Sequence, residues 1–326
     1  MLTVYAIEEG RMVVTAEPVA DALRRAVWID LLNPTAKEDG LVQSALGIEI
    51  PTREEMQEIE VSSRLYREGE ALYMTAPFMH GADTNEVGST PITFVLSGQA
   101  IVTVRYATPK AFAVFAARAA RSASQAATPD AVMVGLFEQV VDRLADILER
   151  IGADMDRTSQ AAFRIAKSSQ SASSKDVALK DALIALGQVG EITARASETL
   201  VGLARIQSFI AAEADALIRK ENKGRIKTLA RDVRSLTEHA KFMNDKATFL
   251  LDAVLGIINI EQTAIIKTFS VVSVALMPPT LIASIYGMNF RLMPELDWSF
   301  GYPLAIVAMV ISAVLPVIYF RRKGWL

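Results

Sequence analysis

Residues 268–290 read TFSVVSVALMPPTLIASIYGMNF and residues 298–320 read WSFGYPLAIVAMVISAVLPVIYF, and neither stretch contains a charged side chain. A helix that crosses the hydrocarbon core of a bilayer needs about 20 mostly apolar residues. The two stretches therefore predict two membrane-spanning helices joined by a short tip. The residues upstream are predicted to be soluble. A large soluble part that leads into two spans favours regulated passage of a small solute.

The composition argues against several kinds of site. The chain has 326 residues, and its 34 basic and 37 acidic residues nearly cancel, so no nucleic-acid partner is expected. It has no cysteine, which excludes disulfides, thiolate catalysis and soft thiolate metal sites. Its two histidines, His80 and His239, are far apart in the sequence, so a zinc site of clustered imidazoles is not expected.

Charges beside the two spans set the expected orientation. Residues 321–323, Arg-Arg-Lys, follow the second span, and Lys267 stands at the start of the first. The tip at 291–297 carries one basic and two acidic residues. Because Lys and Arg favour the cytoplasmic side, both termini are expected in the cytoplasm and the tip outside. The sequence thus predicts a multi-pass membrane protein, embedded in the lipid bilayer.

Residues 1–125 are predicted to form a cytoplasmic domain of α+β class. Strands are expected at 27–32, 71–75, 92–96 and 101–104. The last two flank Ser97-Gly98-Gln99-Ala100 and predict a β-hairpin. A helix is expected over 51–64, with Thr52 as its N-cap and Glu55 three residues later.

Residues 126–224 are predicted to be a cytoplasmic helical region. Helices are expected over 130–167 and 175–220, separated by a serine-rich loop at 168–174. Asn222-Lys223-Gly224 predicts a turn before the next helix.

A long stalk helix is predicted over 225–287, because apolar residues spaced by alternating threes and fours form a heptad stripe there. No proline interrupts this pattern until Pro278, so the helix can continue into the first span and reach a length of about 90 Å. Residues 288–300 are expected to form the periplasmic loop, and residues 301–326 the second span with its basic tail. The stripe consists of Ile226, Leu229, Val233, Leu236, Ala240, Met243, Ala247, Leu250, Val254 and Ile257.

A second stripe on another face of this helix is mostly small or polar. Inside hydrocarbon, such a face must meet another helix or water, so it is either a helix–helix contact or the lining of a pore. Two spans cannot enclose a pathway, and the pore interpretation therefore requires several subunits around a symmetry axis. Met277 and Ile266 would then form narrow apolar rings that gate by dewetting. The stripe consists of Asp252, Gly256, Asn259, Thr263, Ile266, Ser270, Ser273, Met277, Thr280 and Ser284.

The side-chain chemistry of this stripe indicates which kind of ion the pore would pass. Within the span it offers neutral hydroxyl and amide oxygens, which can hold the water shell that Mg²⁺ sheds reluctantly. Asn289 is the natural outer filter, because its side-chain carbonyl accepts hydrogen bonds from metal-bound water. Gly287 permits tight packing or a positive φ at the helix end. Glu295 and Asp297 either concentrate cations at the outer mouth or are ordinary solvated loop charges.

Several of these residues form motifs that resemble the CorA family of magnesium channels. The motifs are Tyr286-Gly287-Met288-Asn289-Phe290, Met293-Pro294-Glu295-Leu296, Trp298-Ser299-Phe300-Gly301-Tyr302-Pro303 and the final Arg321-Arg322-Lys323-Gly324-Trp325-Leu326. The stretch Ile258-Asn259-Ile260-Glu261-Gln262 is similar to the enterobacterial branch. The resemblance covers the whole chain and is strongest after Asn244. A lone Gly-Met-Asn is a weak signal, but its place at the end of a first span, with Met293-Pro294-Glu295-Leu296 four residues on, makes it a strong one.

The resemblance implies a funnel-shaped homopentamer that takes up Mg²⁺, with Co²⁺ and Ni²⁺ as further substrates. It implies a selectivity filter of Gly287, Met288 and Asn289, a gate near Met277 and a basic collar at 321–323. It also implies gating by cytoplasmic Mg²⁺ bound to acidic residues, for which Asp232 is a candidate. At one position where members of this family often carry an acidic residue, this chain has Thr228. No cofactor is expected beyond Mg²⁺ as the transported and regulatory ion.

Two other interpretations stay open. One is a zinc transporter of the same superfamily, although such relatives depart more often from the methionine of the Gly-Met-Asn tripeptide. The other is a membrane-tethered sensor or enzyme without a pore. An enzyme is not expected, because residues 1–220 contain no nucleophile elbow, HExxH motif or glycine-rich phosphate loop.

Overall fold

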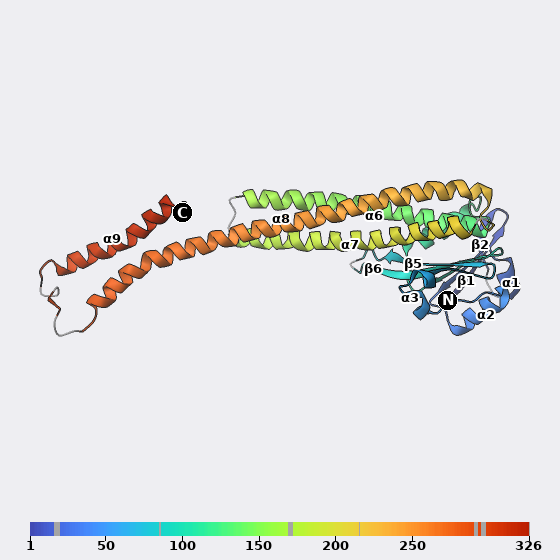
Figure 1. Cartoon of the computed structure of the whole chain (residues 1–326), viewed down its shortest axis with the longest axis horizontal. Helices are drawn as coiled ribbons and strands as arrows, with labels where there is room; N and C mark the ends of the chain where they lie inside the picture. Colours follow the sequence, from blue (N-terminus) through green and yellow to red (C-terminus); the bar gives the residue numbers. More distant parts are fainter. Residues whose placement is uncertain are drawn as a thin grey trace. The chain divides into compact units, whose positions relative to one another are not determined.

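The computed structural model describes residues 1–15, 20–84, 86–168, 172–214, 216–289, 293–294 and 298–325 (Figure 1). The chain divides into two compact units. The first comprises Met1–Ala161 and Ile184–Leu251, and the second comprises Ala162–Leu183 and Asp252–Leu326. Long helices run through both units.

The first unit contains a seven-stranded sheet in the order β2-β1-β3-β7-β6-β5-β4. The β3–β7 pair is parallel, and the other neighbouring strands are antiparallel. The strands are β1 (Leu2–Glu8), β2 (Arg11–Val14), β3 (Trp28–Leu32), β4 (Leu65–Glu68), β5 (Ala71–His80), β6 (Gly88–Leu96) and β7 (Ile101–Arg105). The predicted hairpin is confirmed: Leu96 pairs with Ile101, and the Ser97 Oγ donates to the Ala100 carbonyl at 2.9 Å.

Helices cover both faces of this sheet (Figure 1). On one face, α1 (Ala20–Arg25), α2 (Ala36–Leu46) and α3 (Arg53–Gln57) contribute Leu23, Val42 and Met56 to an aliphatic core. On the other face, aromatic rings pack beneath α5 (Lys110–Arg121) and α6 (Pro129–Lys167). The Phe94 and Phe137 ring centroids, for example, lie 4.9 Å apart. Burial on both sides explains why the central strands are apolar almost throughout.

The helix predicted over 51–64 is wrong in extent. Thr52 and Glu55 do form the expected capping box, but α3 ends at Gln57 and a separate α4 covers Val61–Arg64. The break follows from packing: Met56 is 1% exposed, whereas Ile59 is 86% exposed, so no continuous apolar face extends past the first turn. The Arg64 side chain donates to the Glu58 carbonyl and holds the break in place.

The turn predicted at 222–224 is also wrong, because these residues belong to the first turns of α8 (Lys220–Tyr286). The preceding helix, α7 (Ala172–Glu213), ends well before it. Asp130 at the start of α6 fixes this end of α8. Its Oδ2 accepts from the Asn222 amide at 2.7 Å and from the Arg219 backbone N–H at 2.9 Å. These bonds lower the pKa of Asp130 despite its burial.

The heptad stripe lies on the buried face of α8, as predicted. Leu229, Val233, Ala240, Met243, Ala247 and Leu250 are each less than 5% exposed. Ion pairs to α6 flank the first unit's part of this stripe, with Arg225 2.7 Å from Glu138 and Lys246 2.6 Å from Asp156. The buried stripe and its flanking ion pairs therefore hold the first unit's part of α8 against the neighbouring helices.

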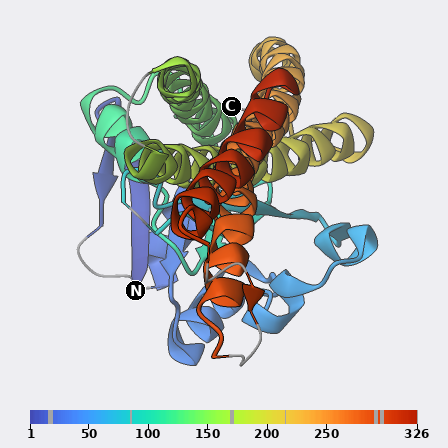
Figure 2. The same ribbon diagram turned by 90° about the vertical axis from the view of Figure 1, so that its left-hand side faces the viewer.

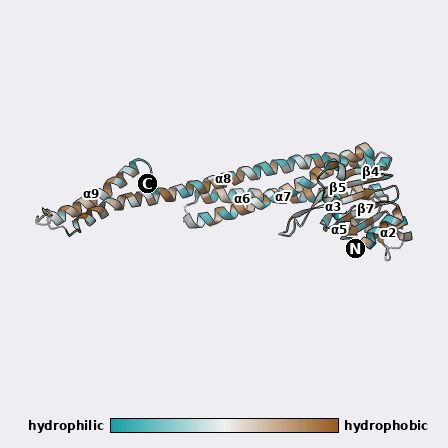
Figure 3. Ribbon diagram, turned by 60° about the horizontal axis from the view of Figure 1, so that its bottom comes forward, coloured by the Kyte–Doolittle hydropathy of each residue, from teal (hydrophilic) through white to brown (hydrophobic). Residues whose placement is uncertain are grey.

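The second unit consists of the end of α6, the start of α7, the rest of α8, and α9 (Gly301–Arg322). Within it, α9 lies beside the last turns of α8 (Figures 1 and 2). Apolar residues dominate both of these segments (Figure 3). Val271 and Ala275, which continue the heptad stripe, are 2% and 8% exposed.

Candidate functional site

Two helices of the described residues are long and apolar enough to cross a membrane, α8 and α9. This agrees with the two spans expected from the uncharged stretches. Helix α8 continues through Pro278 and Pro279 to Tyr286. One helix therefore carries both the heptad stripe and the first apolar span.

The second unit leaves the polar stripe of α8 uncovered. Val271 and Ala275 face the buried side, whereas Met277 is 69% exposed and Ile266 is 64% exposed. Ser270 is half-buried. The other residues of the stripe are all exposed, namely Asp252, Gly256, Asn259, Thr263, Ser273, Thr280 and Ser284. Apolar residues such as Leu276 and Leu281 are also exposed nearby. A single copy of the chain thus leaves this face without a partner inside the described residues.

Three hydroxyl groups of the stripe share one hydrogen-bonding arrangement. The Thr263 hydroxyl donates to the Asn259 carbonyl at 2.8 Å, the Thr280 hydroxyl to Leu276 at 2.7 Å, and the Ser284 hydroxyl to Thr280 at 2.8 Å. Each bond uses the single hydroxyl proton and satisfies a backbone carbonyl one turn earlier. The oxygen lone pairs remain outside these bonds, so the stripe presents acceptors, which suit water molecules bound to a cation.

The first span ends at the Gly-Met-Asn tripeptide. The Gly287 N–H donates to the Ala283 carbonyl at 2.9 Å and the Met288 N–H to Ile285 at 3.2 Å, which closes the helix. Gly287 does not have a positive φ. A Cβ at this position would lie 3.1 Å from the Ala283 carbonyl oxygen, so tight packing is the reason that fits glycine here. Asn289 follows the helix end with its side chain exposed.

The other predicted site residues are more scattered. Glu295 and Asp297 lie outside the described residues. Asp232 is exposed on the soluble part of α8, as is Thr228. Across the described residues, no group of three or more His, Asp or Glu side chains could hold a metal ion. A regulatory ion at Asp232 would therefore need ligands beyond those that one copy brings together.

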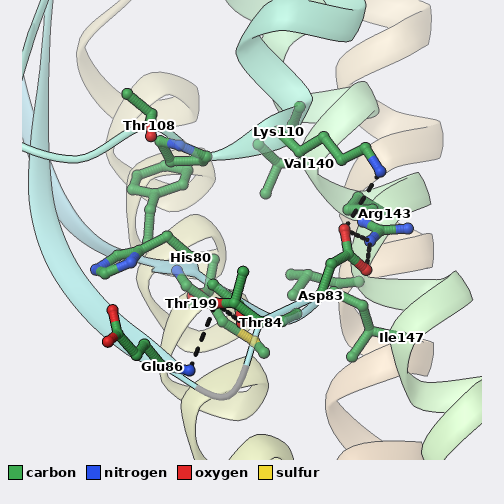
Figure 4. Close-up of a pocket in the computed structure, with 17 residues that line it drawn as sticks. His80, Asp83, Thr84, Glu86, Thr108, Lys110, Val140, Arg143, Ile147 and Thr199 are labelled. Atoms are coloured by element: carbon green, nitrogen blue, oxygen red, sulfur yellow. Dashed lines mark hydrogen bonds and ion pairs between the residues drawn. The ribbon is translucent and has the colours of Figure 1, made fainter.

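Sequence reasoning did not find an ionic cluster around Asp83, which borders a cavity of about 430 Å³ in the first unit (Figure 4). Arg143 lies 2.5 Å, Arg150 3.2 Å and Lys110 3.3 Å from its carboxylate. Although desolvation raises it, hydrogen bonds from these three cations lower the pKa of Asp83 to about 2. His80, at the same cavity, lies with its Nε2 2.9 Å from the Thr90 hydroxyl.

Acid should weaken this cluster. Because the folded-state pKa of Asp83 lies below the ordinary 3.8, its contribution to stability is present above that value and is lost as pH falls towards about 2. We expect Asp83→Asn to be less stable than the unaltered chain near neutral pH and to lose less stability between about pH 5 and about pH 2. Denaturant unfolding at both pH values measures this, with Asp21→Asn as a surface control. An unchanged acid dependence in Asp83→Asn contradicts it.

Comparison with known proteins identifies relatives along the whole chain. A family model described as a CorA-like Mg²⁺ transporter protein matches residues 24–322. The chain is 34% identical over 326 residues to the magnesium transport protein CorA of Salmonella typhimurium, covering 100% of both proteins. The same values hold for the magnesium transport protein CorA of Escherichia coli K12. The complete CorA magnesium transporter from Methanocaldococcus jannaschii shares the fold, with a TM-score of 0.69 at 15% identity over 100% of this chain and 99% of that one.

Proposed function

The chain belongs to the CorA-like Mg²⁺ transporter family, and we propose that it is a membrane channel for Mg²⁺ uptake, with Co²⁺ and Ni²⁺ as further substrates. The observation that carries this proposal is the uncovered face of α8, where hydroxyl and amide oxygens alternate with Met277 and Ile266. Such a face favours contact with water over contact with lipid tails.

The pathway would form between copies of the chain. Two spans from one copy cannot surround a pore, so several α8 helices would gather around one axis, and the family resemblance favours five. Burial of Val271 and Ala275 on the other side of α8 supports an arrangement with α9 outside and the polar stripe inside. In this homopentamer, Asp252, Asn259, Thr263, Ile266, Ser270, Ser273, Met277, Thr280 and Ser284 would line the pore.

Selection of the ion would occur at the outer end of the pore. Five copies of Asn289 would form a ring of amide oxygens that accepts hydrogen bonds from the water shell of Mg²⁺, with Gly287 and Met288 shaping the ring. Glu295 and Asp297 would raise the cation concentration at the mouth. The rings of Met277 and Ile266 would close the pore by dewetting.

Cytoplasmic Mg²⁺ would act on the soluble part of the same helix. We place this soluble part and both termini in the cytoplasm and the spans in the inner membrane, with the loop at 288–300 on the outer side, because basic residues lie at 267 and 321–323. Asp232 is the candidate regulatory ligand, completed by groups of a neighbouring copy. The continuity of α8 would couple metal binding there to the rings in the span.

Ion flux by the purified protein tests the proposal. In proteoliposomes, an inside-negative potential of 100 mV favours entry of a dication by about 4.6 kcal/mol, so Mg²⁺ influx should need no ATP. We expect influx of Mg²⁺ to exceed that of Zn²⁺, measured with ion-sensitive dyes inside the vesicles. Faster Zn²⁺ influx would instead favour a zinc transporter. No flux of any dication, in correctly inserted protein, would favour a sensor or enzyme without a pore.

A further inference from the structure

A glycine turn folds the C-terminal tail back against α9. Gly324 has a φ of +70°, the Trp325 N–H donates to the Phe320 carbonyl at 3.1 Å, and the Gly324 N–H donates to Arg321 at 3.2 Å. This is the Schellman pattern that ends helices, in which the positive φ favours glycine. The Trp325 and Phe320 ring centroids lie 5.1 Å apart and supply the apolar contact that accompanies the pattern. The turn thereby fixes the position of Trp325.

The fixed indole faces the base of the first span. The Lys267 ammonium lies 5.9 Å from the centroid of the Trp325 ring. These two side chains border a hollow of about 720 Å³ in the second unit, which is further lined by Asn259, Ile260, Thr263, Ala264, Thr268 and Gly324. The hydroxyls of Thr263 and Thr268 donate to backbone carbonyls at 2.8 and 3.0 Å. Because the Asn259 amide belongs to the stripe assigned to the pore, the donors that can serve a ligand here are the Lys267 ammonium and the Trp325 indole N–H.

The surroundings of the hollow are strongly basic. Lys267 and residues 321–323 contribute four cations, and neither 262–289 nor 298–325 contains an acidic residue. Glu261, just before the first of these segments, has its carboxylate 2.9 Å from the Lys175 ammonium and is already paired. N–H donors in a basic hollow suit an anion with several oxygens, such as a phosphate group.

The position of the hollow relative to the apolar spans is also defined. Lys267 directly precedes the uncharged stretch 268–290, and Arg321 directly follows 298–320. Both charges therefore mark the end of the apolar spans, where lipid headgroups begin, and tryptophan is favoured at that depth. We propose that this hollow binds the phosphate of an anionic phospholipid in the cytoplasmic leaflet. The choice of leaflet rests on the orientation given in the proposed function.

Native mass spectrometry of the full-length protein, released from detergent with phosphatidylglycerol or phosphatidylcholine, tests this site. We expect the unaltered chain to retain phosphatidylglycerol preferentially. Lys267→Gln should reduce this retention by about fivefold, because one cation at the headgroup level is lost. Trp325→Ala and Gly324→Ala should reduce it as well, the latter because alanine strains the positive φ. Lys241→Gln, an exposed cation on the soluble part of α8, is the matched control and should retain lipid normally.

Four results would overturn the site: equal retention of both lipids, normal retention by Lys267→Gln, an equal loss in Lys241→Gln, or complete displacement of the lipid by inorganic phosphate at constant ionic strength. The last would identify a site for a free anion instead. Ion flux measured on the same preparations separates this proposal from the proposed function. Normal flux with no lipid preference refutes only the lipid site, whereas absent flux with preserved lipid preference refutes only the channel.

Discussion

Replacing Asn289 with alanine is expected to reduce Mg²⁺ influx by at least about tenfold, because a hydrogen bond to a charged group contributes about 1.5–3 kcal/mol and every copy loses one. Asn289 is exposed immediately after the end of α8, so the substitution leaves the helix and its closing hydrogen bonds in place. Uptake in cells that lack other Mg²⁺ transporters, compared at equal protein levels in the membrane, measures the effect.

Asn289→Asp separates charge from hydrogen bonding at this position. A ring of carboxylates should hold dications more tightly and release them more slowly, so influx falls while the apparent affinity rises. Asn244→Ala, an exposed asparagine on the soluble part of α8, is the matched control and should leave influx unchanged. Undiminished and equally selective influx in both Asn289 variants would remove this residue from the filter.

Removing the Asp30 carboxylate should lower the free energy of unfolding more than any other single substitution predicted for this chain. Asp30 is 3% exposed, and its oxygens accept from Arg105 Nε at 2.9 Å, from the second guanidinium nitrogen at 2.7 Å and from the Thr103 hydroxyl at 2.7 Å. Asp30→Ala leaves the guanidinium buried without its partner, which costs about 3–5 kcal/mol. Trp28 donates to Thr103 at 3.0 Å in the same network, so its fluorescence during denaturant unfolding reports the change.

The double variant Asp30→Leu with Arg105→Met is the control for this effect. Apolar residues of similar volume avoid both the unpaired charge and the desolvation of two ions, so most of the lost stability should return. If Asp30→Ala is as stable as the unaltered chain, the pair does not hold β3 against β7.

The sequence was most informative where a repeating pattern determines burial. The heptad stripe from Leu229 to Leu250 predicted the buried face of α8, because one side of a long helix must pack wherever apolar residues recur every 3.5 positions. The hairpin around Ser97 was equally predictable from two β-rich runs and a short polar turn. The uncharged spans followed from length and composition alone.

Features that depend on distant partners were not predictable. Asn222 and Gly224 read locally as a turn, but Asp130, 92 residues from Asn222, holds Asn222 in a helix through a side-chain bond. The cluster around Asp83 joins a loop to α5 and α6, and nothing near this aspartate in the sequence indicates its three cations. Gly324 was identified only as part of the final motif, and nothing in that motif indicated the positive φ that fixes Trp325.

The orientation of the polar stripe can be measured by single-cysteine modification, which is direct because the chain has no cysteine of its own. In proteoliposomes, a charged, water-soluble thiol reagent should react with Thr280→Cys and Ser284→Cys and block Mg²⁺ influx in both variants. Ala275→Cys, on the covered side of α8, should stay unmodified. Protection of Thr280→Cys and Ser284→Cys from the charged reagent, together with reaction with a lipid-soluble one, would place the stripe in the lipid and contradict the proposed pore.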